Sequence, residues 1–381
     1  MMKKVLQLLS YVLVAATATL ATLYWVNVNQ STKLQQLSQI IQSHYVEDVD
    51  PVEVEDAAAQ GMISALSDRW SYYIPASEYA TYVEQSENAY VGVGITILEQ
   101  EDGSGFEIIA VEADGPAYEA GIRIQDVLIG AQGQDLTEIS STGVRNLVRG
   151  EEGTYVDLTV LRQGEELTFS VQRRTLQMTV ADGELLAGGV GLITIYNFDD
   201  RCASESISRI EELRAQGADK LIFDVRNNGG GYAHEMVELL DYLLPEGDLF
   251  RTVNYAGKEN VDTSDANCLD LPMAVLVNAE SYSAAEFFAA ALREYDAAIV
   301  VGEQTSGKGY FQNTFSLNDG SAVALSTGRY YTPKGECLEG VGITPDVPVE
   351  VDEETYAGIY YGTVAAEDDP QLQAAITALN K

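Results

Sequence analysis

The sequence predicts a multidomain α/β protein with an N-terminal helical segment, a β-sandwich and an α/β core of stacked βα units. Its 381 residues are enough for two or three domains. A content of 46% hydrophobic and 21% charged residues is ordinary for globular proteins. Apolar residues recur at helical spacing up to Gln85, alternate in short strands from Tyr90, and form alternating strands and helices after Gly189.

Composition excludes several classes of function. Lysine and arginine number 22 against 59 aspartates and glutamates, which gives a net charge of −37 and argues against a nucleic-acid partner. The histidines are His44 and His234, and the cysteines Cys202, Cys268 and Cys337 form no C-x-x-C pair. We therefore expect no metal site and no cofactor. The count still allows one disulfide, between Cys268 and Cys337.

Residues 1–30 are predicted to be an export signal or a membrane anchor. Lys3 and Lys4 precede an uncharged, largely apolar stretch from Val5 to Thr32, a pattern typical of both. Small residues from Ala16 to Ala18 offer a cleavage site, whereas about 20 apolar residues can span a bilayer with the lysines inside. Either alternative places the rest of the chain outside the cytoplasm, anchored or secreted.

The remaining chain divides into three predicted regions. Residues 31–87 are helical, with a break at Asp50-Pro51 where the proline suits the first turn of a new helix. Residues 88–174 form the β-sandwich with two short helices. Residues 175–381 form the core, in which buried strands alternate with helices. The expected buried strands are Lys220 to Arg226, Met273 to Asn278 and Ala297 to Gly302.

Ser283 stands where the second buried strand meets a helix, within Ser281-Tyr-Ser-Ala-Ala-Glu286. Backbone N–H groups at a helix start are unpaired and lie at the positive end of the helix dipole, so they can stabilise an anionic oxygen. Ser283 and Glu286 also fit a capping box, which only stabilises the helix. The motif alone favours the capping role.

Glycine-rich loops follow the other two buried strands. Gly302 to Gly309 nearly matches a phosphate-binding loop, but Gly309 stands where a hydroxyl is needed, so nucleotide binding is rejected and Lys308 remains as a loop lysine. Consecutive glycines in Asn227 to Gly231 let N–H groups converge on an anion, or simply form a tight turn.

A third glycine-bearing loop opens the β-sandwich. Val91, Gly92, Val93 and Gly94 lead into a strand, an arrangement in which amides bind a peptide carboxylate while the strand pairs with the peptide. A plain entry into the strand is the alternative.

Taken in order, these pieces resemble the C-terminal processing peptidases, PDZ-containing serine peptidases of the tail-specific protease type. The resemblance covers residues 34–381 and rests on several motifs that are individually weak. They are D-V-R-N-N-G-G from Asp224, S-Y-S-A-A-E from Ser281, T-S-G-K-G-Y-F-Q from Thr305, G-V-G-I-T-P-D ending at Asp346, and D-P-Q-L-Q-A-A from Asp369.

The resemblance implies a Ser-Lys catalytic pair. Ser283 matches the nucleophile, Lys308 the general base, and Gln312 the glutamine that orients this lysine. The oxyanion hole would comprise the N–H of Ala284 and that of Gly229 or Gly230. Tyr282 departs from the family pattern, which commonly has alanine there. Supporting roles are expected for Glu286 and for Asp224 and Arg226 beside the glycine loop. The loop expected to bind the peptide carboxylate is Val91 to Gly94.

The predicted function is an extracytoplasmic serine endopeptidase that binds protein C-termini and cleaves peptide bonds through an acyl-enzyme. A lysine buried without a carboxylate partner has a pKa lowered by up to ~3–5 units, so it can accept the serine proton. Expected partners are peptides with free apolar C-termini, the membrane through the first segment, and a second copy in a homodimer. The alternative is a catalytically silent PDZ scaffold.

Overall fold

The computed structural model describes residues 13–14, 17–19, 32–100 and 102–381. The signal or anchor predicted for residues 1–30 therefore lies almost entirely outside the described residues. Within the described part of the chain, no helix has the length and apolar character needed to cross a membrane. The chain forms two compact units, Met1–Ser77 with Gln312–Ser326, and Glu78–Phe311 with Thr327–Lys381.

The first unit combines helices with a strand that pairs far along the sequence. Asp50 accepts a hydrogen bond from the Val52 N–H (2.8 Å) and Pro51 begins the second helix, as predicted. Residues 31–87, predicted to be helical, also contain a strand, because Tyr72, Tyr73 and Ile74 pair antiparallel with residues 322–324. The elements of this unit are α2 (Lys33–His44), α3 (Pro51–Ser64) and β1 (Tyr72–Ile74). Three further elements have residues in both units: α4 (Ala76–Ser86), β17 (Tyr310–Ser316) and β18 (Ala322–Tyr331).

The second unit begins with the β-rich domain. Its antiparallel sheet has the order β3-β4-β5-β7-β8, with β6 paired to β5, and its two helices contribute to one buried apolar cluster. Strands β2 (Ala89–Gly92) and β9 (Arg174–Gln177) pair where the domain joins the core. The sheet and helices are β3 (Ile95–Glu99), β4 (Phe106–Val111), α5 (Pro116–Ala120), β5 (Val127–Ala131), β6 (Gln134–Asp135), α6 (Ser141–Val148), β7 (Tyr155–Arg162) and β8 (Glu165–Gln172).

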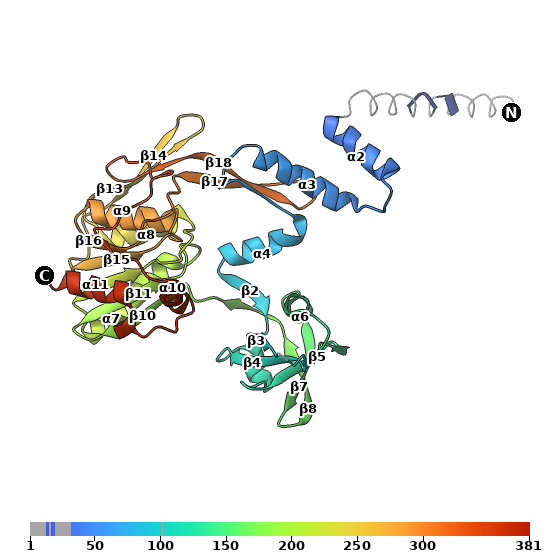
Figure 1. Ribbon diagram of the computed structural model, residues 1–381, viewed down its shortest axis with the longest axis horizontal. Coiled ribbons are helices and arrows are strands. Elements are labelled where there is room, and N and C mark those ends of the chain that lie inside the picture. The colour runs from blue at the N-terminus through green and yellow to red at the C-terminus, as the bar shows by residue number, and fades with distance from the viewer. Residues whose placement is uncertain (1–12, 15–16, 20–31, 101) are drawn as a thin grey trace, which may run out of the picture. The chain divides into compact units, whose positions relative to one another are not determined.

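The core, drawn from green to red in Figure 1, is built on a six-stranded sheet. Its order is β10-β11-β12-β15-β16-β19, and every neighbouring pair after β10-β11 is parallel. Polar loops follow three of these strands, and because carboxyl ends of parallel strands share one edge of a sheet, these loops converge there. The strands are β10 (Ala181–Leu186), β11 (Val190–Ile195), β12 (Lys220–Asp224), β15 (Met273–Val277), β16 (Ala298–Gly302) and β19 (Val347–Pro348).

Alternating side chains of the sheet bury two apolar layers. Leu221 and Phe223 pack with residues of α7, α8 and α9, whereas Ile222 packs with Leu372 and Ala375 of α11. Helix α9 begins directly after Ser283, where the sequence predicts a helix, but the hairpins β13–β14 and β17–β18 were not predicted. The other elements are α7 (Cys202–Gln216), α8 (Ala233–Leu243), β13 (Gly247–Asn254), β14 (Glu259–Ser264), α9 (Ala284–Glu294), α10 (Glu353–Tyr360), η1 (Ala366–Asp368) and α11 (Pro370–Leu379).

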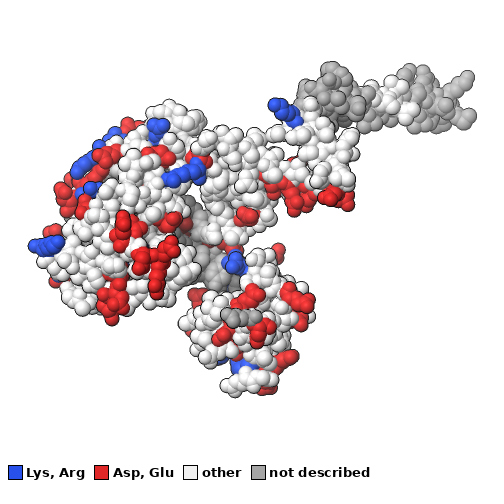
Figure 2. All heavy atoms as spheres, viewed as in Figure 1, with Lys and Arg blue, Asp and Glu red and all other residues white. Residues whose placement is uncertain are grey.

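Two expectations about side chains can be compared with the structure. Cys202, Cys268 and Cys337 are all free, so the disulfide that the cysteine count allowed does not form. On the face drawn in Figure 2, acidic side chains are more prominent than basic ones, in keeping with the net charge of −37. A surface of this sign repels a phosphate backbone.

A buried ion pair fixes the end of β12 to helix α11. The Arg226 guanidinium lies 2.5 Å from the Asp224 carboxylate and 2.8 Å from that of Asp369, and Arg226 and Asp369 side chains are 6% and 7% exposed. Asp369 also accepts hydrogen bonds from the Gln371 and Leu372 N–H groups, which caps α11. Burial disfavours the Arg226 charge, but the two carboxylates more than offset it and raise the pKa of Arg226.

Replacing Arg226 with methionine should lower the free energy of unfolding by about 3–5 kcal/mol, because Asp224 and Asp369 would remain buried without their cation. Urea denaturation of the purified chain measures this. Arg214→Met is the control, since it removes an exposed pair with Glu211 and should change stability by less than about 1 kcal/mol. Equal losses in the two variants would contradict the role given to Arg226.

Candidate active site

Ser283 occupies a strained turn between β15 and α9. Its backbone has φ 58° and ψ −127°, a region that non-glycine residues rarely adopt and that costs about 1–3 kcal/mol. The turn before it is fixed by Ser281, whose Oγ donates to the Val225 carbonyl (2.7 Å) and accepts from the Asn278 N–H (3.0 Å). Ser283 is 5% exposed, and Ala284 begins α9, so the N–H of Ala284 has no acceptor within the helix.

Glu286 connects this turn to the loop that carries Lys308. Its carboxylate, fully buried, accepts from the N–H groups of Ser283 (3.1 Å), Gly307 (2.8 Å) and Lys308 (2.8 Å), and from the Thr305 hydroxyl (2.5 Å). Burial raises the pKa of Glu286, and these hydrogen bonds oppose that rise. The contact with Ser283 is the one expected of a capping box, but the other three contacts hold the lysine loop.

Lys308 follows β16 on this loop and is partly buried. Its Nζ lies 5.7 Å from the centroid of the Tyr282 ring. Gly307 has a φ of +79°, and a Cβ atom there would lie 3.0 Å from the N atoms of Val341 and Gly342. The glycine before Lys308 is therefore needed both for its conformation and for its space.

The glycine loop after β12 packs directly on Ser283. A Cβ atom on Gly230 would lie 2.7 Å from Ser283 Cβ. The side chain of Asn228, fully buried, spans the loop: its Nδ2 donates to the Ile195 carbonyl (2.7 Å) and its Oδ1 accepts from the Gly230 N–H (2.8 Å). The N–H of Gly230 is thus committed to Asn228, whereas Gly229 lies against the Tyr282 phenol.

Gln312 belongs to the first unit, where its Nε2 donates to the Ser326 hydroxyl (2.9 Å). Asp224 and Arg226 form the ion pair that fixes β12 to α11. Asn228 and Thr305 were missed by the sequence analysis. Both lie within motifs that the sequence analysis quotes, but their roles depend on partners 33 and 19 residues away, which local sequence does not indicate.

The PDZ-like domain has a groove of about 300 Å³ between β3 and α6. Gly92, Val93 and Gly94 line it, together with Ile95 to Ile97 of β3 and several residues of α6. Val91 is not among the lining residues and pairs with Thr175 in the β2–β9 ribbon. Within the described part of the chain, no group of three or more His, Cys, Asp or Glu side chains is placed to hold a metal ion.

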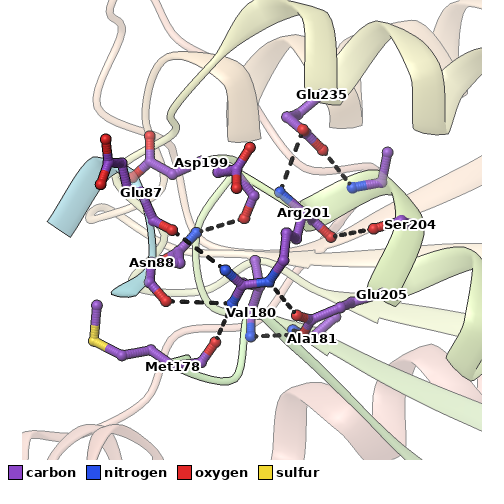
Figure 3. Close-up of polar contacts among 12 residues, drawn as sticks. Glu87, Asn88, Met178, Val180, Ala181, Asp199, Arg201, Ser204, Glu205 and Glu235 are labelled. Carbon is purple, nitrogen blue, oxygen red and sulfur yellow. Dashed lines mark hydrogen bonds and ion pairs between the residues drawn. The ribbon is translucent and has the colours of Figure 1, made fainter. Parts of the chain in front are cut away.

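A polar junction surrounds the two chain segments that lead into and out of this domain (Figure 3). The amides of Asn88 and Asn197 form reciprocal hydrogen bonds of 3.0 and 2.8 Å, and Asn88 also donates to the Asp200 carbonyl. The Arg201 guanidinium donates to the carbonyls of Glu87, Asn88 and Met178. Phe198, which lies between Asn197 and Arg201 in the sequence, donates its N–H to the Gly230 carbonyl (2.8 Å), so this segment also supports the glycine loop.

Family models match three parts of the chain. Residues 189–349 match peptidase family S41, residues 89–172 match the PDZ domain, and residues 14–77 match the N-terminal domain of the activating protease CtpB. The chain is 30% identical over 348 residues to a probable CtpA-like serine protease of Staphylococcus saprophyticus, and the matched region covers 89% of this chain and 70% of that protein. This chain belongs to the carboxy-terminal processing proteases of family S41.

Two further proteins are similar to this chain, one in sequence and one in fold alone. The carboxy-terminal processing protease CtpA of Bacillus subtilis is 29% identical over 377 residues, or 94% of this chain and 80% of that protein. A putative S41 protease from Bacteroides fragilis shares the fold, with a TM-score of 0.54, 15% identity, and coverage of 91% of this chain and 97% of that one. The family and the mixed α/β fold predicted from the sequence are confirmed, and the chain is a serine-type peptidase with a PDZ domain. The predicted domain boundaries and site residues stay predictions.

Asp199, at the polar junction, should make the stability of this protease depend on pH. Burial, and secondarily the Glu235 carboxylate, raise the pKa of Asp199 from 3.8 to about 7. A raised pKa means that the stabilisation is complete below pH 4 and is lost as pH rises toward 7. Relative to wild type, Asp199→Asn should therefore gain roughly 2–4 kcal/mol of unfolding free energy between pH 4 and pH 8.

The measurement is urea denaturation of both proteins across this pH range. Asp200→Asn is the matched control, because the neighbouring Asp200 side chain is exposed. If the difference in unfolding free energy between wild type and Asp199→Asn stayed constant from pH 4 to pH 8, the prediction would be contradicted.

Proposed function

We propose that this protease cleaves peptide bonds with a Ser283–Lys308 dyad through an acyl-enzyme. The observation that carries the proposal is the set of hydrogen bonds to Glu286, which joins the Ser283 turn to the Lys308 loop. A capping glutamate has no need of the lysine loop, whereas a serine that requires a base must be held close to it. The strained backbone of Ser283 supports the same role, because such strain concentrates at functional sites.

In the proposed reaction, Ser283 Oγ attacks the scissile carbonyl carbon while its proton passes to the neutral amine of Lys308. Collapse of the tetrahedral intermediate breaks the C–N bond, and Lys308 returns the proton to the leaving amine. Water then hydrolyses the acyl-enzyme with Lys308 again acting as the base. The orienting role of Gln312 stays a prediction from the resemblance.

The oxyanion hole is assigned to the N–H groups of Ala284 and Gly229. Ala284 is at the start of α9, where unpaired N–H groups and the helix dipole favour negative charge. Gly230, the alternative from sequence, already donates its N–H to Asn228 Oδ1. Its contribution is instead steric, since only a glycine allows the loop to approach Ser283 this closely.

Substrate recruitment is assigned to the groove between β3 and α6. Its lining includes the Gly92 to Gly94 loop, several apolar side chains and two arginines, Arg145 and Arg149. Loop amides suit a terminal carboxylate, β3 suits pairing with an extended peptide, and Val93 and Val144 suit an apolar terminal side chain. We also propose that the chain works outside the cytoplasm, anchored or secreted through its first 30 residues, because Lys3 and Lys4 precede an apolar stretch.

Ser283→Ala and Lys308→Ala should each reduce cleavage of an unfolded protein substrate by at least ~10³-fold, because the nucleophile and its base act as a unit. Gel or mass-spectrometric assays of the full chain measure this. Lys258→Ala, in the loop between β13 and β14, should retain wild-type activity. Cleavage by Lys308→Ala at the wild-type rate would reject the dyad. If the wild-type protein bound peptides but did not cleave them, the alternative of a PDZ scaffold would be favoured.

Amidation of the substrate C-terminus should weaken cleavage by about 5- to 70-fold, because a charge-assisted hydrogen bond to the terminal carboxylate contributes roughly 1–2.5 kcal/mol. The loss should appear mainly in KM. The comparison uses two forms of one peptide that differ only in this group. Equal kcat/KM for the acid and the amide would show that the carboxylate is not recognised.

A further inference from the structure

Helix α6 presents both apolar and charged side chains to the groove of the PDZ domain. Val144 and Val148, which are buried, lie one helical turn apart and line the groove. Ser141 and Arg145 also line it, and the spacing of these four residues places them on one face of the helix. The helical wall of the groove therefore combines an apolar surface with a cation.

Arg145 is the arginine of this wall whose charge is available to a ligand. The other arginine that lines the groove, Arg149, is paired with the Glu84 carboxylate at 2.7 Å. Within the described part of the chain, by contrast, the exposed side chain of Arg145 forms no ion pair and no hydrogen bond. A guanidinium presents a planar fork of donors that matches a carboxylate. An unpaired arginine in a peptide groove therefore favours a ligand with an acidic side chain.

The direction of a bound peptide determines which of its residues lies opposite Arg145. A terminal carboxylate at the Gly92 to Gly94 loop places the peptide antiparallel to β3, because this loop leads into the first residue of the strand. Ser141 donates to the Glu99 carboxylate (2.9 Å) at the other end of β3, so α6 begins at that end and Val148 lies nearer the loop. The last residue of the peptide therefore lies beside Val148, and its upstream residues pass Arg145.

Strand geometry narrows the position to the third residue from the C-terminus. Alternate side chains of an extended peptide point to the same side, so the last and third-last residues both face α6 and lie about 6.7 Å apart. Arg145 is three residues before Val148, or about 4.5 Å along the helix axis. Helical side chains lean toward the N-terminus of their helix, which brings the guanidinium closer still to the third-last residue.

We propose that Arg145 makes this groove select substrates that have aspartate or glutamate as the third-last residue and an apolar residue at the C-terminus. The selection is a local contact, because a chain with a net charge of −37 repels acidic peptides at long range. Arg145 is thus a specificity-determining residue of the recruitment step and takes no part in the chemistry. The inference rests on the function proposed for the groove, and it adds the class of C-terminus that is recruited.

Peptide binding to the full chain carrying Ser283→Ala, which prevents cleavage, tests the proposal. The peptides share an apolar C-terminus and differ only at the third-last residue, which is aspartate, asparagine or lysine. We expect the aspartate peptide to bind about 3- to 10-fold tighter than the asparagine peptide, the range of a partly exposed charge-assisted pair. Arg145→Gln should remove this difference, and Arg145→Glu should favour the lysine peptide instead. Arg123→Gln is the matched control and should keep the preference, since it removes the same charge from the same domain outside the groove lining.

The outcomes separate the inference from the proposed function. Equal binding of the aspartate and asparagine peptides, or an unchanged preference in Arg145→Gln, would overturn the inference alone. An equal gain from aspartate at the second-last residue, whose side chain points away from α6, would also overturn it, since this would indicate general attraction. A preference for lysine in Arg145→Glu would support the inference, because a misfolded domain would not gain a new preference. Equal binding of free and amidated C-termini in every variant would instead reject the carboxylate recognition on which the inference depends.

Discussion

The buried carboxylate of Glu286 is the constraint on which the rest of this site depends. It accepts four hydrogen bonds, one from the Ser283 turn and three from the loop containing Thr305 to Lys308. A carboxylate with no exposed surface is costly unless its oxygens are fully used. The two segments therefore have to remain together for Glu286 to remain charged in the interior, and their relative position is fixed by that requirement.

Backbone geometry on the other side of Ser283 adds a second constraint. The turn at Ser283 takes a positive φ, and Gly230 packs against its Cβ atom with no room for a side chain. Asn228 holds the glycine loop in this position by bonding to Ile195 and to Gly230. Strain at Ser283 is thus maintained by contacts from both sides, which is the condition under which a strained residue persists.

The features that were predicted from the sequence are those determined by local residue patterns. Helix α9 and the three buried strands follow from apolar runs, and the Ser283–Glu286 spacing correctly indicates a contact at the helix start. Sequence spacing gives no indication of pairing between distant segments. Strand β1 pairs with β18 about 250 residues later, and β18 belongs to a hairpin that the sequence did not predict. Asn228 and Thr305 were missed because their roles depend on partners that only the fold brings near.

The glycine loop also depends on the polar junction with the PDZ domain. Phe198 supports the loop through its N–H bond to Gly230, and a Cβ atom on Gly231 would lie 2.3 Å from the Phe198 carbonyl carbon. Asn197, the residue before Phe198, hydrogen-bonds to Asn88 at one end of the domain. Arg201, three residues after Phe198, donates to the carbonyls of Asn88 and Met178 at the two ends of the domain (Figure 3). Because one short segment makes both sets of contacts, a rearrangement at the domain ends has to be accommodated within a few residues of Gly230. The geometry of the glycine loop is therefore set by the domain junction as well as by the core sheet.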